Sequence, residues 1–250
     1  MHRSGPLIVV VSLVLAGCSG SGDDGGEAAP DTVATSTAAS TGAATPTTTP
    51  GTEPVTEAES IADPVDAAFD VAPGTEQVTV TGAEPGATLD VVDRDGAVLA
   101  TGVADANGAF VARRLPGGAN VSVRSDGAAS DEVQVMARGD SPPASFFAEQ
   151  RLPTDGLGYI ETRDGTLLSA SVWLPGPADA GPYPTVVEYS GYTPSDPESQ
   201  GFPDILNGLG YAYVGVNIRG TGCSGGSFRY FEYTQSTDGY DVIETVAAQP

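Results

Sequence analysis

The segment from Ser19 to about Val65 contains no aromatic residue and no basic residue. It consists mainly of Ser, Thr, Ala, Gly, Pro and acidic residues, as in the run Thr47-Thr48-Thr49-Pro50. Such a composition cannot bury enough apolar surface to offset the entropy of ordering the chain, so we expect residues 19–65 to be a disordered tether. Folded structure is therefore expected only after about residue 66.

Residues 1–18 have the pattern of a leader for export. Arg3 precedes the apolar run Leu7–Leu15, which is shorter than the roughly 20 residues that span a bilayer and fits a signal peptide. The run ends in Leu15-Ala16-Gly17-Cys18, which resembles a bacterial lipoprotein signal. The resemblance implies a lipid on Cys18 and anchoring to the outer face of the bacterial cytoplasmic membrane. The alternative is an ordinary signal peptide in which Cys18 is incidental.

Charge and histidine content restrict the function. The chain has 33 acidic residues against 10 arginines and no lysine, a net charge of −23, so it is a poor candidate for binding nucleic acid. The one histidine, His2, lies in the predicted leader. A complete Ser-His-Asp triad or a histidine-ligated metal site is therefore excluded from the rest of these residues, and no cofactor is implied.

Residues 66–140 show a repeated strand-and-turn pattern. Turn residues such as Asp95-Gly96, Asn107-Gly108 and Pro116-Gly117-Gly118 separate short runs in which polar and apolar residues alternate. The six predicted strands are Glu76–Thr81, Thr88–Val92, Val98–Val103, Ala109–Arg113, Asn120–Arg124 and Glu132–Met136. This spacing predicts a small β-sandwich that resembles bacterial immunoglobulin-like domains.

The pattern changes after Ser141-Pro142-Pro143. Arg163-Asp164-Gly165 predicts the turn of an antiparallel hairpin that opens a second domain, over residues 150–250. The segments that follow alternate between strand and helix. They are a strand at Pro184–Tyr189 buried on both faces, a helix at Pro203–Gly210, a strand at Tyr211–Asn217 and a helix at Thr237–Ala248 with Tyr240, Ile243 and Val246-Ala247 on one side. This order predicts the opening part of an α/β-hydrolase sheet.

Four motifs follow one another in this second domain. They are Arg163–Leu168 with Trp173-Leu174-Pro175, then Pro184–Tyr192, Gly210–Gly222 and Asp238–Glu244. Each is short, but as an ordered series over roughly Leu157–Pro250 they resemble the X-Pro dipeptidyl-peptidase and cocaine esterase (CocE/NonD) family of serine hydrolases. The resemblance implies a peptide or a small ester or amide as substrate.

The resemblance also implies a role for Tyr192. Family members use a tyrosine hydroxyl after this strand as one donor of the oxyanion hole, and Tyr192 matches it by position. Gly191 departs from the family, which commonly has proline there. Tyr189 is the neighbouring candidate if the alignment with the family is shifted. The purely structural alternative is that Tyr192 is a loop aromatic packed on the sheet edge.

Gly222-Cys223-Ser224-Gly225-Gly226 formally matches the G-x-S-x-G pattern of a nucleophile elbow. An elbow needs a strand directly before the serine and a helix directly after it, and neither is predicted here, so we interpret Ser224 as a chance match. The resemblance places the elbow after the helix Thr237–Ala248 and one further strand. Nucleophile, acid and histidine are thus all expected beyond residue 250, and the 250-residue chain is expected to be inactive.

Two questions stay open on the sequence. Cys223 either pairs with a cysteine outside these residues or is a buried free thiol, and it is not a catalytic nucleophile because no histidine or lysine is present to lower its pKa. The main alternative to a serine hydrolase is a non-catalytic surface lipoprotein that acts as a binding or structural module.

Overall fold

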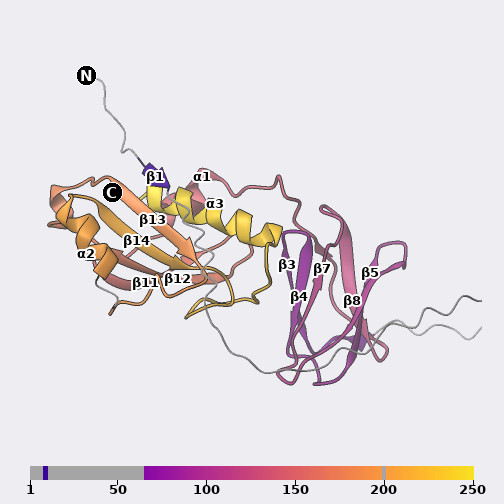
Figure 1. Ribbon diagram of the computed structural model, residues 1–250. Coiled ribbons are helices and arrows are strands. Elements are labelled where there is room, and N and C mark those ends of the chain that lie inside the picture. The colour runs from indigo at the N-terminus through magenta and orange to yellow at the C-terminus, as the bar shows by residue number, and fades with distance from the viewer. Residues whose placement is uncertain (1–7, 11–64, 199–200) are drawn as a thin grey trace, which may run out of the picture. The chain divides into compact units, whose positions relative to one another are not determined.

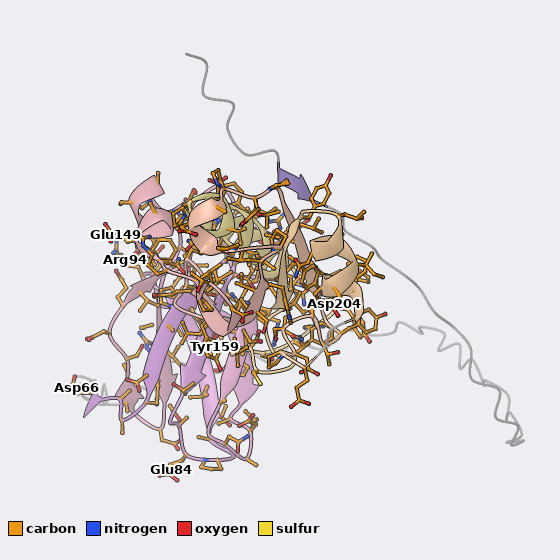
Figure 2. All side chains as sticks on the ribbon, turned by 90° about the vertical axis from the view of Figure 1, so that its left-hand side faces the viewer. Asp66, Glu84, Arg94, Glu149, Tyr159 and Asp204 are labelled. Atoms are coloured by element: carbon orange, nitrogen blue, oxygen red, sulfur yellow. The ribbon has the colours of Figure 1, made fainter. Side chains whose placement is uncertain are left out.

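A computed structural model describes residues 8–10, 65–198 and 201–250, which all fall within one compact unit (Figure 1). The predicted tether and Cys18, where the sequence predicts a lipid, lie outside the described residues. Acidic side chains are spread over the surface, as Asp66, Glu84, Glu149 and Asp204 illustrate (Figure 2). No helix among the described residues is long and apolar enough to cross a membrane.

The first folded part contains two facing β-sheets. One has the strand order β2 (Val65–Asp66), β9 (Ala128–Ala129), β8 (Asn120–Ser125), β5 (Thr88–Asp93) and β6 (Val98–Val103), with β10 (Val133–Gln134) also paired to β8. The other has the order β3 (Asp70–Gly74), β4 (Gln77–Thr81) and β7 (Phe110–Arg113). Each of the six predicted strands coincides with an observed one, and the pairing is antiparallel apart from β2 with β9.

Alternation along the strands builds the core between these two sheets. Val78 and Val80 of β4 are fully buried, and they belong to the same apolar cluster as Leu89 and Val91 of β5 and Val123 of β8. Burying one such side chain stabilises the fold by about 1.5–3 kcal/mol. The predicted antiparallel sheets are thus present, and they share one apolar core; this part of the chain is called the sandwich below.

The second part is a mixed sheet with the order β1 (Ile8–Val10), β13 (Thr185–Ser190), β14 (Ala212–Asn217), β12 (Leu167–Trp173) and β11 (Gly156–Glu161). β11 and β12 form the predicted hairpin, β12 is antiparallel to β14, and β13 is parallel to β14. β1 pairs in parallel with β13 and belongs to the predicted leader, so removal of the leader would remove this strand.

Helices lie on both faces of this sheet (Figure 1). Leu168 of β12 and Val214 of β14 pack with Val242 of α3 (Tyr233–Ala247) on one face. On the other face, Tyr213 of β14 contacts Phe202 of α2 (Gly201–Gly208), with ring centroids 5.7 Å apart. The helices α1 (Ala144–Glu149) and η1 (Ala178–Ala180), which the sequence pattern did not predict, complete the described elements.

Two details of this part correct the sequence-based predictions. In β13 the consecutive residues Val186 and Val187, which point to opposite faces of the sheet, are both buried while the other residues are half-buried, so burial on both faces holds at the centre of the strand and not along its whole length. In α3 the predicted apolar side is wrong in part, because Val246 is buried but Tyr240 and Ala247 are exposed, whereas Asp238 and Asp241 are fully buried. The physical reason is ion pairing, since both carboxylates meet arginines on the sheet side of the helix.

Candidate active site

The loop that carries Tyr192 begins directly after β13 and crosses the end of β14. It passes so close to the strand that a Cβ atom added to Gly215 would lie 1.9 Å from the backbone oxygen of Pro194. Glycine inside a strand marks such a close backbone approach. The absence of a side chain at Gly215 is therefore what allows the loop to lie against the sheet.

Asn217, the last residue of β14, holds this loop. It is 1% exposed, and its Nδ2 donates hydrogen bonds to the Tyr192 backbone oxygen at 2.7 Å and to Thr221 Oγ1 at 3.1 Å. Its Oδ1 accepts from the Ser195 hydroxyl at 2.6 Å and from the Ser195 N–H at 3.2 Å. One buried amide thus links both ends of the Tyr192–Ser195 segment to the sheet.

Ser224 contributes to the same polar cluster. Its hydroxyl donates to the Asn217 backbone oxygen at 2.7 Å, accepts from the Ser169 N–H at 2.9 Å and lies 3.2 Å from Ser169 Oγ. It sits in a turn in which its N–H bonds the Thr221 oxygen at 3.0 Å. A turn anchored to β12 has no strand leading directly into the serine, which agrees with the interpretation of the G-x-S-x-G match as chance.

On the helix face of the sheet, Arg219 joins two carboxylates. Its Nε and Nη2 donate to Asp238 at 2.6 and 2.7 Å, and Nη2 also contacts both oxygens of Asp164 at 2.9 and 3.1 Å. All three side chains are nearly or fully buried. The arginine thereby connects the turn before β12, the loop after β14 and helix α3.

A second buried pair lies beside the first. Arg163 contacts Asp241 through Nε and Nη2, with the shortest distance 2.7 Å, and its backbone N–H donates to the same carboxylate at 2.9 Å. Arg163 Nη1 also donates to the Asp140 backbone oxygen at the end of the sandwich. The turn Arg163-Asp164-Gly165 is thus linked to α3 in two ways, directly from Arg163 to Asp241 and through Arg219 from Asp164 to Asp238.

The Arg219 cluster and the pair of Arg163 and Asp241 together contain three carboxylates and two guanidinium groups. One negative charge is therefore in excess within a buried site. Burial raises the pKa of Asp238 to about 6, against the opposing effect of Arg219. For Asp164, burial also favours the neutral acid, but the charge of Arg219 and hydrogen bonds from Thr162 and Thr166 outweigh it and lower the pKa. Of the two carboxyl groups that Arg219 joins, Asp238 therefore takes up a proton first.

Tyr189, the alternative to Tyr192, is engaged elsewhere. Its hydroxyl donates to the backbone oxygen of Gln235 in α3 at 3.1 Å. Burial, together with the nearby charge of Asp238, raises its pKa. Tyr192, in contrast, has a side chain that is 69% exposed, on the loop beyond the strand end.

Cys223 is an exposed free cysteine, so the buried-thiol alternative is wrong. No disulfide partner for it is found in the described part of the chain, and pairing with a cysteine elsewhere stays a prediction. The same described residues contain no group of three or more His, Cys, Asp or Glu side chains that could hold a metal ion.

Comparison with known protein families finds a similarity over the second part of the chain. Residues 164–250 match the model of the X-Pro dipeptidyl-peptidase (S15) family. The match confirms the resemblance that the four motifs predict, over about a third of the chain. No curated protein matches the sequence.

Two solved structures resemble parts of the chain. One is XC6422 from Xanthomonas campestris, an α/β serine hydrolase without a lid, with 25% identity over 40% of this chain and 47% of that chain and a TM-score of 0.29. The other is the BSP domain of a biofilm associated protein, with 24% identity over 29% of this chain and 14% of that chain and a TM-score of 0.25. The chain thus spans less than half the length of either structure.

The structure brings together several residues that the sequence had only marked as motif members. Asp164, Arg219 and Asp238 come from three of the four motifs and form one ion cluster. Sequence reasoning missed Gly215 and Asn217, which position the Tyr192 loop. A glycine in the middle of a β-branched strand was the available signal for the first, and no local signal marks the second.

Proposed function

We propose that this protein is a serine hydrolase of the X-Pro dipeptidyl-peptidase/CocE type, which cleaves an amide or ester through an acyl-enzyme. The observation that carries the proposal is the match of residues 164–250 to the S15 family. The family name supports a peptide substrate. The mixed sheet with helices on both faces is consistent with this chemistry, because it presents loops at the carboxyl ends of its parallel strands.

Tyr192 is assigned as an oxyanion-hole donor. Its loop follows β13, lies against Gly215 and is held by Asn217, so the hydroxyl is carried on a fixed support. The family proline is replaced by Gly191, and the Asn217 amide supplies the restraint on the backbone that a proline would supply. A donor of this kind stabilises the negative charge of the tetrahedral intermediate by about 2.7–4 kcal/mol.

The nucleophilic serine, the acid and the histidine are assigned to residues after Pro250. The test is fluorophosphonate labelling of the protein translated to the natural stop codon, beside the 250-residue chain. We expect labelling of the longer protein only, and its loss when the elbow serine is changed to alanine. Absence of labelling in a folded longer protein would favour the non-catalytic binding or structural module instead.

Lipidation of Cys18 and anchoring outside the cytoplasmic membrane are part of the same proposal. The order of basic residue, apolar run, small residues and cysteine supports it. Expression of the wild type and Cys18→Ser in a bacterial host, followed by fractionation, tests it. We expect the wild type in the membrane fraction with a lipid mass on Cys18, and no such mass in the variant.

A further inference from the structure

A cavity of about 540 Å³ lies between the sandwich and the segment that leads into α3. Its walls come from the start of β4 and the two residues before it, from the end of β7 and the two residues after it, from Arg138 after β10, and from residues 229–234. The volume is within the range of sites that bind small molecules. None of the residues that hold the Tyr192 loop lines it.

Arginine is concentrated in the walls of this cavity. Four of the ten arginines of the chain, Arg113, Arg114, Arg138 and Arg229, line it together with two glutamates. The lining therefore has an excess of two positive charges in a protein with a net charge of −23. A local positive field of this kind attracts anions that the rest of the surface repels.

Two of the arginines are neutralised and two are not. Arg138 pairs with Glu76 at 2.6 Å, and Arg113 Nε lies 2.8 Å from Glu232. Neither Arg114 nor Arg229 forms an ion pair within the part of the chain that the structure describes, and both side chains are exposed. Each therefore has a full set of guanidinium donors available to a ligand.

Aromatic rings form another part of the lining. Phe231 is 93% exposed, and its ring centroid lies 6.1 Å from that of Tyr230, which is also exposed. Tyr233 stacks under the guanidinium of Arg138 at 3.2 Å. Exposed rings next to arginines offer flat apolar surface for the body of a ligand while the guanidinium groups bind its charge.

Backbone strain is concentrated at the same place. Glu76, Arg114 and Phe231 have φ angles of 53°, 61° and 54°, in the left-handed region that non-glycine residues avoid. Among the described non-glycine residues only Asp126 has a positive φ angle without lining the cavity. Such conformations cost about 1–3 kcal/mol each and gather at ligand sites, where they aim side chains that an ordinary turn would direct elsewhere.

We propose that this cavity binds a carboxylate attached to an aromatic or apolar body, the chemistry found at the free carboxyl end of a peptide. Arg114 and Arg229 bind the carboxylate, since the planar guanidinium group matches a carboxylate in a two-point contact. Tyr230 and Phe231 contact the apolar body. This binding requires no catalysis, so it stands whether or not the hydrolase assignment holds.

The test uses the 250-residue chain and calorimetry at low ionic strength. The probe is N-acetylphenylalanine, and its neutral control is N-acetylphenylalaninamide, which differs only in the carboxylate. We expect the acid to bind at least about tenfold more tightly than the amide, the factor that one charge-assisted hydrogen bond contributes. Arg114→Gln and Arg229→Gln should each weaken binding of the acid by about tenfold, and added salt should weaken it further.

Arg124→Gln is the matched control variant, because Arg124 is exposed, makes no ion pair among the described residues and lies outside the cavity. It should bind the acid as the wild type does. Circular dichroism checks that each variant is folded. Equal binding of acid and amide, no binding of either to folded protein, or tighter binding of phenyl phosphate than of the acid would each overturn the proposal.

Discussion

The side-chain amide of Asn217 donates a hydrogen bond of 2.7 Å to the backbone oxygen of Tyr192. The bond lies where the neighbouring parallel strands β13 and β14 end. The amide belongs to β14, whereas the carbonyl belongs to the loop after β13. Because the same amide also accepts two hydrogen bonds from Ser195, it determines where the backbone of Tyr192 lies relative to the sheet.

Asn217→Ala should therefore loosen the loop as well as destabilise the protein. It removes the hydrogen bonds of the Asn217 amide to the Tyr192 oxygen and to the buried Ser195 N–H and hydroxyl, at a cost of about 1–3 kcal/mol in the free energy of unfolding. Urea denaturation measures that loss, and hydrogen exchange should be faster at the Ser195 amide. Asn107→Ala, at an exposed turn of the sandwich, is the control and should change neither quantity appreciably.

Gly215→Ala tests the close approach of the same loop from the other side. The added methyl group would overlap the Pro194 oxygen, so the loop must move away from β14 and the free energy of unfolding should fall by about 1–3 kcal/mol. Gly208→Ala provides the comparison, because no atom lies within 4 Å of its added Cβ and it should be neutral or slightly stabilising. Equal effects of the two substitutions on thermal unfolding would contradict this account.

The strands of both parts could be predicted because their signals are local. Val78 and Val80 alternate with threonines, and this period of two is present in the sequence whatever the rest of the chain does. The turn at Arg163-Asp164-Gly165 and the helix after Ser236 are recognisable for the same reason, although α3 begins four residues earlier than predicted, at Tyr233.

The buried face of α3 could not be predicted, since it depends on residues distant in the sequence. Asp241 is buried because Arg163, 78 positions away, meets it, and an acidic residue on a helix otherwise indicates the solvent side. The hydrogen bond from Asn217 to Tyr192 likewise joins residues 25 positions apart in the sequence. The family resemblance assigned Tyr192 to the site, but it did not indicate these supports.

The buried pair of Arg163 and Asp241 gives a third prediction. Arg163→Met removes one partner and leaves the Asp241 carboxylate buried without its counter-charge, so the free energy of unfolding should fall by about 3–5 kcal/mol. Replacing both partners, with Arg163→Met and Asp241→Leu, should recover a large part of that loss, because no unpaired charge remains. Chemical denaturation of the two single variants and the double variant measures the coupling. A double variant as unstable as the sum of the single variants would exclude a direct pair.

The exposed thiol gives a fourth prediction. In a Cys18→Ser background, Cys223 should react with a thiol reagent in the native protein at the rate of an unfolded control, since its side chain is accessible. Cys223→Ser should change the free energy of unfolding by no more than about 0.5 kcal/mol, as is usual for surface positions. A reaction that becomes measurable only in denaturant would mean that the thiol is covered.

The excess negative charge around Arg219 makes the stability of this region depend on pH. Asp238 has a pKa of about 6 in the folded protein, above the value of about 3.8 for an unperturbed aspartate, so the folded state binds more protons between these two values. The contribution of Asp238 to stability therefore rises as the pH falls from 7 toward 4, by about 1 kcal/mol between pH 7 and pH 5. Asp164 does not contribute in this window, because its pKa is lowered and its stabilising effect is lost only in stronger acid.

Asp238→Asn isolates this effect, since asparagine has nearly the same shape and does not titrate. The difference in the free energy of unfolding between wild type and variant should shift by about 1 kcal/mol in favour of the wild type when the pH is lowered from 7 to 5. Carbon NMR of the aspartate side chains should place the titration midpoint of one buried carboxyl near pH 6 and show its absence in the variant. A difference that stays constant between pH 7 and pH 5 would mean that Arg219 keeps Asp238 ionised throughout, and that the excess charge is neutralised at another group.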